Sequence, residues 1–444
     1  MRYLLLVPIF YSITLPGKSQ TAGEIIGELK SINKEVRIKP CVKGISPVIT
    51  NRAMNVFLAD KTGYLSESGD LSCYTNYVTL NTTEGKFTVN HNFQNAKGID
   101  ERTKNLFSIG VSANIANGFA ATFLDKKFEN ELGVTLSYKW LSKVKTHITG
   151  CTQTQNGGNQ KQAMDALRAA ILYSLEIEII KKEADFKTAI DGIDPADVPG
   201  QNLPAAKAVM KQKFYEDLKE EYEEKFAKLQ AETLTKTNNF GLITTGWTSL
   251  TAGLPLAFPK YSIAESLTAS FREKHPYPMD IMLSHTRLWE STKIGRLFLT
   301  IGGKILLNNS KLSYALSKTN FTEYKNLGGT DTLHLAGLRN DKAYIGNYET
   351  FVTPSLTGRL VYFPPASHVG ISFLLEQNFG SYNLLNGRLG IPVILINSKN
   401  LPAVNFDFYV LFFDMNNKIE RAKKYGNKTS IGLGVGIPFS RLIY

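Results

Sequence analysis

The final stretch of the chain, residues 428–444, alternates between apolar and small side chains. Apolar residues hold every odd position from Ile431 to Phe439, and serine or glycine holds the even positions from Ser430 to Gly436. Because successive side chains of a strand point to opposite faces, this segment has one continuous apolar face and one small, polar face. Such a strand suits a wall with lipid on one side and a packed or wet interior on the other. It predicts an antiparallel transmembrane β-barrel.

The same alternation recurs upstream and predicts an all-β barrel of about twelve strands over residues 85–444. In residues 106–115, for example, Phe107, Ile109 and Val111 alternate with serine and glycine. The mean hydropathy of −0.14 resembles that of a soluble protein, but the lipid-facing and interior-facing residues of a barrel average to such a value. The predicted strands before the last are 85–94, 106–115, 133–141, 239–247, 261–272, 277–288, 294–307, 355–363, 367–378, 385–395 and 403–413.

The lengths of the predicted connections assign them to the two ends of the barrel. Bacterial barrels have short periplasmic turns and longer extracellular loops. With the C-terminus in the periplasm, the three longest connections, 141–238, 308–354 and 414–428, all fall outside the cell. The proline-containing connections 364–366 and 396–402 fall on the periplasmic side. This parity predicts a location in the bacterial outer membrane.

Residues 156–236 have a helical pattern instead of strand alternation. Apolar residues recur at helical spacing from Met164 to Leu175 and, after a turn-rich segment, every four residues from Met210 to Phe226. Charged residues fill the other faces of both segments. We expect an α-helical hairpin inserted in an extracellular loop, with its two apolar stripes packed together.

The N-terminal part divides into two segments. Residues 1–19 have a basic start, an apolar run and small residues before a cleavage point, and are expected to be a secretory signal peptide. Residues 20–84 mix a helical pattern with strand-like pieces such as MNVFLA and YVTLN. They are interpreted as a small N-terminal periplasmic extension, with a plug or extra strands as open alternatives.

The three cysteines show no spacing typical of a metal site. In an oxidising periplasm two of them could form a disulfide, with Cys41 and Cys73 as the first choice and Cys151 left over. The alternative is that all three are unpaired. No metal and no other cofactor is expected.

Nine charged residues lie opposite the apolar faces of the predicted strands and are candidates for lining the lumen. Six basic residues facing three acidic ones would bias a wet pore towards anions. Alternatively, the same side chains pair across the interior and close it. The nine are Lys139, Arg272, Asp280, Arg296, Lys304, Arg359, Glu376, Arg388 and Asp407.

Several aromatic residues fall near the ends of predicted strands. Tyrosine and tryptophan gather at the two interfaces of a membrane barrel. The candidates for these girdles are Tyr138, Trp140, Trp247, Tyr261, Tyr277, Trp289 and Tyr444.

Enzyme and nucleic-acid functions find little support in the sequence. Ser284 and His285 are adjacent on one strand and therefore point to opposite faces, so they cannot act as nucleophile and base. The net charge of +12 is spread along loops, without the interleaved basic and aromatic residues of a nucleic-acid-binding fold. A charge so distributed suits anionic lipid head groups or polysaccharide. We expect a non-enzymatic protein that binds no nucleic acid.

The signal-peptide pattern, the amphipathic strands and the aromatic C-terminal residue together resemble outer-membrane β-barrel proteins of the Bacteroidota. The resemblance implies that the barrel-insertion machinery reads the last strand, through Phe439 and Tyr444, and that outer-membrane lipid surrounds the barrel. The leading expectation is a porin-like barrel that passes or binds small solutes, anionic ones included. The first alternative is a filled barrel that serves as a surface platform, whose hairpin at 156–236 and long loop bind an extracellular or envelope protein or a polysaccharide. The second is a soluble, β-rich secreted protein.

Overall fold

The structure is a computed structural model of the whole chain. It describes residues 21–62, 75–81, 86–94, 100–116, 119–120, 123–124, 127–128, 132–149, 159–193, 203–256, 261–266, 270, 272–275, 277–307, 317–326, 335–346, 348–380, 383–397, 402–418 and 429–441. The predicted signal peptide, Cys73, Cys151 and Tyr444 lie outside these residues.

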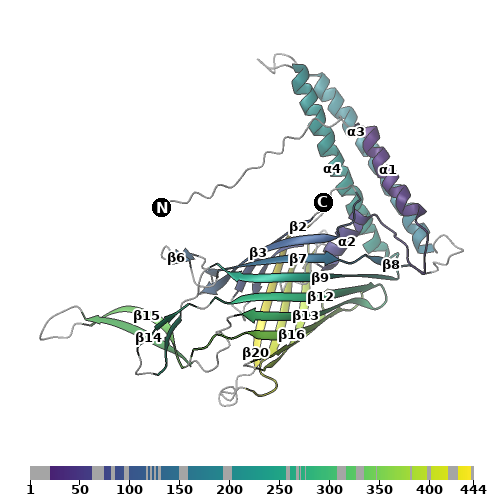
Figure 1. Ribbon diagram of the computed structural model, residues 1–444. Helices are drawn as coiled ribbons and strands as arrows, with labels where there is room; N and C mark the ends of the chain where they lie inside the picture. The colour runs from purple at the N-terminus through teal and green to yellow at the C-terminus, as the bar shows by residue number, and fades with distance from the viewer. Residues whose placement is uncertain are drawn as a thin grey trace.

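Twelve strands of the described chain pair antiparallel in one closed ring (Figure 1). Neighbours in sequence are neighbours in the ring, and the first strand closes it by pairing with the last, through Thr75 opposite Arg441 and Leu80 opposite Val435. In ring order the strands are β1 (Thr75–Asn81), β2 (Lys86–Gln94), β3 (Asn105–Ala116), β7 (Gly133–Leu141), β9 (Leu242–Pro255), β12 (Met279–Ser291), β13 (Gly295–Leu307), β16 (Thr353–Phe363), β17 (Ile371–Asn378), β18 (Leu385–Ile396), β19 (Pro402–Phe412) and β20 (Thr429–Arg441). The prediction of a closed antiparallel barrel of twelve strands is confirmed.

The strand assignments differ from the structure in three places, although the number of wall strands is right. Residues 261–272 are not a wall strand; they contribute β10 (Tyr261–Ala264) and the start of β11 (Arg272–Lys274), which pair outside the ring. Residues 75–81, which were assigned to the N-terminal extension, form wall strand β1 instead. The run predicted at 239–247 is longer than expected, because β9 continues to Pro255.

The two faces of the wall differ in chemistry. On β12, Ile281 and Leu283 point outward and are about half exposed, whereas Ser284, Thr286 and Leu288 point inward and are buried. Adjacent inward residues bond to one another: Thr286 Oγ1 lies 2.9 Å from Thr300 Oγ1. The outer surface is therefore mainly aliphatic, while small polar side chains fill much of the interior.

The two ends of the barrel are unlike. One, called the turn end here, carries the start of β1, the end of β20 and the short connections 292–294, 364–370 and 397–401. The other, the loop end, carries connections 308–352 and 413–428. Beyond it, a four-stranded sheet comprises β10, β11, β14 (Ser317–Asn326) and β15 (Leu335–Ile345). Further short strands are β4 (Phe119–Ala120), β5 (Phe123–Leu124) and β6 (Lys127–Phe128).

The helical hairpin leaves the barrel at the turn end. It lies between β7 and β9, and its first residues after β7 form β8 (Lys145–His147), which pairs with the start of β9. The expectation that the hairpin shares an end with 414–428 is therefore wrong. The prediction includes one strand too many at 261–272 and omits the strand at 75–81. Every connection between these two segments is therefore assigned to the wrong end of the barrel.

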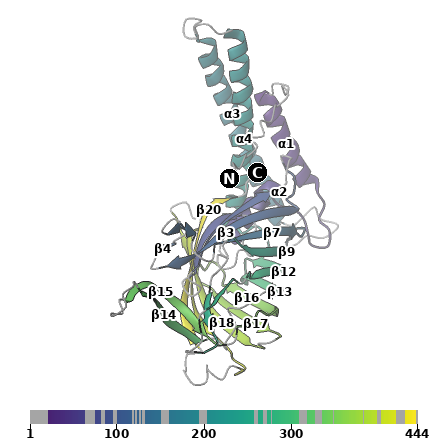
Figure 2. The ribbon, with the colours of Figure 1, turned by 60° about the vertical axis from the view of Figure 1, so that its left-hand side comes forward.

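Three long helices form a bundle that projects from the turn end (Figures 1 and 2). They are α1 (Ala22–Ile38), α3 (Asn159–Asp191) and α4 (Leu203–Thr237). Their buried residues form one apolar cluster that includes Ile25, Leu175 and Tyr222. Ion pairs join the helices, with Lys30 Nζ 2.7 Å from Glu176 Oε1 and Lys219 Nζ 2.8 Å from Glu28 Oε2. No helix in the described ranges combines the length and the apolar character needed to cross a membrane.

Candidate functional site

The fourth helix, α2 (Asn51–Thr62), occupies the mouth of the barrel at its turn end. Val56, Phe57, Leu58 and Ala59 are consecutive and all at most 3% exposed, so the helix is buried around its whole circumference. A helix that is apolar on every side must be surrounded by protein. The Phe57 ring meets that of Phe240 edge-on, with the ring centroids 5.8 Å apart.

The wall supplies an apolar layer that surrounds α2. Inward-facing residues of seven different strands belong to the same buried cluster as the helix. Because these strands lie on several sides of the ring, the layer crosses the lumen instead of lining one side of it. The wall residues are Leu106, Leu141, Ile243, Trp247, Leu288, Phe298, Val361, Phe363 and Ile394. We call α2 together with these nine residues the plug layer.

A buried ion-pair group fixes the end of α2 to the wall. Lys61 Nζ lies 3.4 Å from Glu290 Oε1, and Glu290 Oε2 accepts a hydrogen bond of 2.7 Å from Arg296 Nε. The Arg296 guanidinium also lies over the Phe363 ring, 5.6 Å from its centroid. Since breaking a buried pair leaves an uncompensated charge, this contact holds the helix in one position.

Eight of the nine predicted lumen residues lie on inward faces of wall strands. Arg388 Nη2 lies 2.7 Å from Asp407 Oδ2, and its guanidinium lies 3.5 Å from the Tyr409 ring centroid. Nearer the loop end, Lys304 Nζ lies 3.8 Å from Asp280 Oδ2. Lys139 is fully buried and Arg359 interacts with Asp407. Arg296 belongs to the plug layer's ion-pair group, and Glu376 is half-buried on the inward face of β17.

Glycine makes room for the central charge pair. A Cβ atom on Gly390 would lie 2.6 Å from Asp407 Oδ1 and 2.5 Å from Ser372 Oγ. Any side chain at this position would therefore displace the carboxylate that Arg388 holds. Arg388 and Asp407 thus pair inside the barrel, as the second of the two possibilities that the sequence left open expects of inward charges.

Three further sequence predictions have a defined place. Arg272 lies on exposed β11 outside the ring, so its assignment to the lumen is wrong. Trp247 is 1% exposed in the plug layer and does not belong to an interfacial girdle. Phe439 is half exposed on the outward face of β20 near the turn end.

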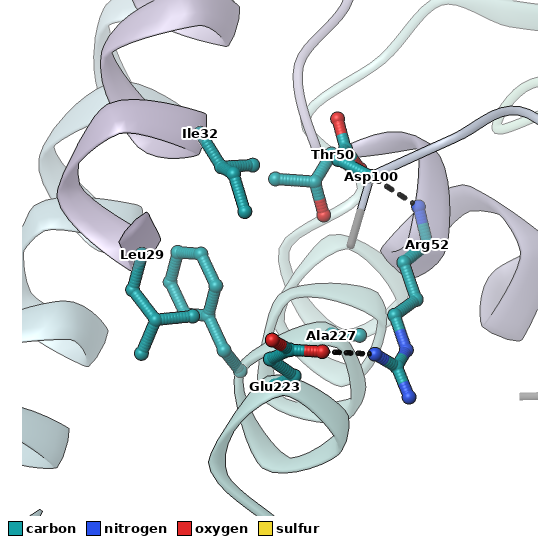
Figure 3. A pocket seen from close by; sticks show the side chains of 8 residues that line it. Leu29, Ile32, Thr50, Arg52, Asp100, Glu223 and Ala227 are labelled. Atoms are coloured by element: carbon teal, nitrogen blue, oxygen red, sulfur yellow. Dashed lines mark hydrogen bonds and ion pairs between the residues drawn. The ribbon is translucent and has the colours of Figure 1, made fainter. Parts of the chain in front are cut away.

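A small polar joint connects α2, the bundle and the barrel rim (Figure 3). The Arg52 backbone N–H donates to Asp100 Oδ1 at 3.0 Å, and Arg52 Nη1 lies 2.8 Å from Glu223 Oε2 of α4. Asn51 Nδ2 donates to the Asp100 backbone carbonyl at 2.9 Å. Asp100 belongs to the β2–β3 connection, so one carboxylate ties the rim to the first turn of α2.

Burial dominates the electrostatics of this joint. It raises the pKa of Asp100 to about 6, although two hydrogen bonds from the helix oppose the shift. Burial also raises the pKa of Glu223 despite its pairing with Arg52. The sequence did not indicate these residues. Residues 54–59 have a strand-like pattern, so a helix starting beside Arg52 was not expected, and the contact with Asp100 joins distant segments.

Within the part of the chain that the structure describes, no three histidine, cysteine or acidic side chains gather where they could hold a metal ion. Cys41 is buried and forms a disulfide whose partner lies outside the described residues.

Asp100 is predicted to make the joint more stable in mild acid. A raised pKa means that the folded state binds this proton more tightly than the unfolded state, so stability is greatest below the unfolded pKa and falls as the pH rises towards about 6. Asp100→Asn should therefore flatten most of the pH dependence, leaving the part due to Glu223. Amide hydrogen exchange of residues 51–62, compared at pH 7 and pH 5, measures this pH dependence of stability. Asp191→Asn, at an exposed position, is the control, and an unchanged pH dependence in Asp100→Asn contradicts the prediction.

No protein-family model matches the chain, and no curated protein matches it. Among solved structures, it is similar to the beta domain of the Bordetella autotransporter BrkA, with 8% sequence identity and a TM-score of 0.23. That match covers 83% of this chain and 96% of the other. A likeness this weak assigns no function, which has to be inferred from the barrel and its helices.

Proposed function

We propose that the protein is a bacterial outer-membrane barrel with a closed lumen, which anchors a helical arm in the periplasm for binding an envelope partner. Membrane residence is supported by the outer surface, where aliphatic side chains project from strands all round the ring. Soluble monomers rarely expose apolar patches of more than a few hundred Å². Examples on well-separated strands are Ile109, Leu283, Leu356, Ile391 and Ile431.

The outward face carries charge at a position that lipid can accommodate. Arg287 points outward on β12, and four residues, roughly 13 Å, separate it from the end of that strand. A long basic side chain can extend to the interface while its stem stays in the apolar layer. His285, two residues deeper, has a hydrogen-bond partner in Thr248 Oγ1 at 3.0 Å.

Connection lengths support an orientation with the turn end in the periplasm. Apart from the hairpin, the turn end has short connections such as 292–294, whereas the loop end has the long 308–352. Short turns lie on the periplasmic side of bacterial barrels. In this orientation the bundle of α1, α3 and α4 extends into the periplasm, and α4 alone is roughly 50 Å long at 1.5 Å per residue.

The plug layer is the observation that favours a closed barrel over an open pore. It joins α2 to seven strands in one dry cluster, so a solute would have to displace a buried helix in order to pass. The polar interior beyond it supports a second candidate function, a gated pore in which α2 is the gate. Its charged residues, Arg359 and the Arg388–Asp407 pair, would then select the solute.

An apolar stripe on the bundle supports a binding role for the arm. Tyr173, Ile177 and Ile180 recur at helical spacing on α3 and are all more than half exposed. Residues three and four apart share one helix face, so the three form a continuous strip. Helix grooves and helical partners bind such strips through their apolar side chains.

Residence in a bilayer predicts a large effect of charge on the outer wall. Leu283→Arg, near the middle of β12, should cost about 2–4 kcal/mol of folding free energy in lipid vesicles. Urea-dependent folding of the refolded protein measures this cost. Tyr173→Arg, exposed on the bundle, should cost less than about 0.5 kcal/mol. Equal costs at the two positions would contradict a transmembrane barrel.

The closed lumen predicts electrical silence in a planar bilayer. The wild-type protein should give no steady conductance, and Phe57→Asp, which places a charge inside the plug layer, should produce steps. Val209→Asp, at an exposed position on α4, should stay silent. Steady wild-type conductance that falls when Arg359 and Arg388 are neutralised would support the pore instead.

The arm predicts a contact along the exposed stripe of α3. A photo-crosslinking residue at Ile177, introduced in the producing cells, should yield a specific adduct with an envelope protein. Lys236, exposed on α4, serves as the control position. Ile180→Glu should weaken the adduct because it places a charge in the strip, and equal labelling at 177 and 236 would contradict a specific surface.

A further inference from the structure

A cavity of about 450 Å³ lies at the rim of the turn end beside the plug layer. One wall is a tight hairpin in which Val42 and Ile45 exchange backbone hydrogen bonds of 3.0 and 2.9 Å. Lys43 and Gly44 at its tip have positive φ angles of 48° and 77°, as a two-residue hairpin turn requires. The cavity therefore has a defined backbone frame.

The frame is attached to the barrel on two sides. The Ser46 backbone N–H donates to the Thr146 carbonyl at 3.1 Å, and the Ile148 N–H donates to the Gly44 carbonyl at 2.9 Å, so the hairpin extends the pairing of β8. The opposite wall is the first half of α2, with Asn51, Met54 and Asn55. The cavity thus exists only when the hairpin, the rim and α2 are assembled together.

All charged residues that line the cavity are basic. They are Lys39, Lys43, Arg102, Lys143 and Lys145. None of them forms an ion pair with another residue of the described chain. Asp100, two residues before Arg102, has its carboxylate hydrogen-bonded to the first turn of α2.

Arg102 is the innermost of these charges and has unused hydrogen-bonding capacity. Its Nη2 donates to the Leu141 carbonyl at 3.1 Å, which fixes the guanidinium in place. Its Nε is buried and has no hydrogen-bond acceptor among the described residues. A guanidinium has five N–H donors, and the bond to Leu141 uses only one of them, so donors remain for an anion in the cavity.

The rest of the lining is mainly apolar, with Ser46, Asn51, Asn55 and Thr146 as its polar members. The apolar side chains between the basic ones include Val42, Ile45, Ile49, Met54 and Val144. An inorganic ion would leave this surface in contact with water. The chemistry fits a molecule with an anionic head and an apolar body.

The cavity lies just beyond the apolar band of the wall. Phe93, Phe107 and Trp140 are exposed on the outward faces of β2, β3 and β7 at their turn ends. Trp140 precedes Lys143 by only three residues, roughly 10 Å of extended chain. Aromatic side chains mark the level of lipid head groups, so the five basic residues lie at or just outside that level.

We propose that this cavity binds the phosphate head group of an anionic phospholipid, with Arg102 as the central contact and the lysines at the mouth. The inference rests on the proposed membrane residence. The occupant seals the contact between hairpin and rim and thereby supports the position of α2.

Lipid binding by the detergent-solubilised full-length protein tests the proposal without requiring insertion into a bilayer. A short-chain phosphatidylglycerol is titrated and followed by native mass spectrometry, with phosphatidylcholine and inorganic phosphate as the other arms. Phosphatidylglycerol should bind to the wild type and phosphatidylcholine should bind much more weakly. Each basic residue near a lipid surface contributes about fivefold, so Arg102→Gln/Lys143→Gln/Lys145→Gln should bind on the order of a hundredfold more weakly.

The matched control removes the same charge elsewhere. Lys181→Gln/Lys211→Gln/Lys213→Gln, all exposed on the bundle, should bind like the wild type. Unchanged binding by the cavity variant, or an equal loss in the control, overturns the proposal. So does inorganic phosphate binding as tightly as the lipid, which would indicate a site for a free anion.

Folding and membrane insertion are read out separately. Heat-modifiable mobility reports whether each variant forms the barrel. If the triple variant fails to fold, Lys143→Gln and Lys145→Gln, both at exposed positions, should each lower affinity about fivefold. A protein that folds and inserts into vesicles but shows no lipid preference refutes this site alone, whereas failure of the wild type to insert refutes the membrane assignment.

Discussion

The structure depends on the pairing of the first strand with the last. A sheet of twelve strands that stayed open would leave two unpaired edges, which no protein can expose to lipid and few can expose to water. The register from Thr75 opposite Arg441 to Asn81 opposite Gly434 removes both edges at once. β1 enters the ring from the turn end, and α2, the described element before it, lies at that end as well. The closed ring thus surrounds α2 at its mouth.

All four described helices lie at the turn end of the barrel. The bundle helices α1, α3 and α4 reach the barrel through the segment before α2 and through the connection between β7 and β9, both at the turn end. Arg52 joins these routes to each other and to the rim, since its guanidinium pairs with Glu223 of α4 and its backbone N–H donates to Asp100 of the β2–β3 connection. The helical arm, the plug layer and the rim are consequently one assembly (Figure 3).

The wall was predictable from the sequence because its signal is local. Alternation in residues such as Ile431 to Phe439 has a period of two and needs no knowledge of distant partners. YVTLN at 77–81 has a strand-like pattern and extra strands are one alternative for residues 20–84, but the run is too short, and too close to material of another kind, to be assigned to the wall. Glu265, in the apolar phase of residues 261–272, was the available sign that this segment lies outside the wall.

The plug layer could not be predicted, since it exists only through contacts between distant segments. MNVFLA has the apolar run of a buried strand, and length and flanking residues alone do not distinguish such a strand from a helix buried on all sides. The eight inward-facing charges could be placed from the alternation of inward and outward residues along their strands. Arg272 could not, because that alternation relates to the lumen only in strands of the barrel wall. The basic cavity gave no signal either: Arg102 meets Lys43 and Lys145 only after three separate segments fold together.

The closing pair of strands imposes an order on folding. Thr75 and Arg441 are separated by nearly the whole barrel sequence, and contacts of such high sequence separation form late and slowly. Until β20 is in place the ring stays open, and α2 can enter its mouth from the side without passing through a finished wall. Once the ring closes, the wall surrounds the helix and the apolar layer holds it. Release of α2 then requires disruption of that layer or of the ring itself, so the closed state is protected kinetically as well as by its contacts.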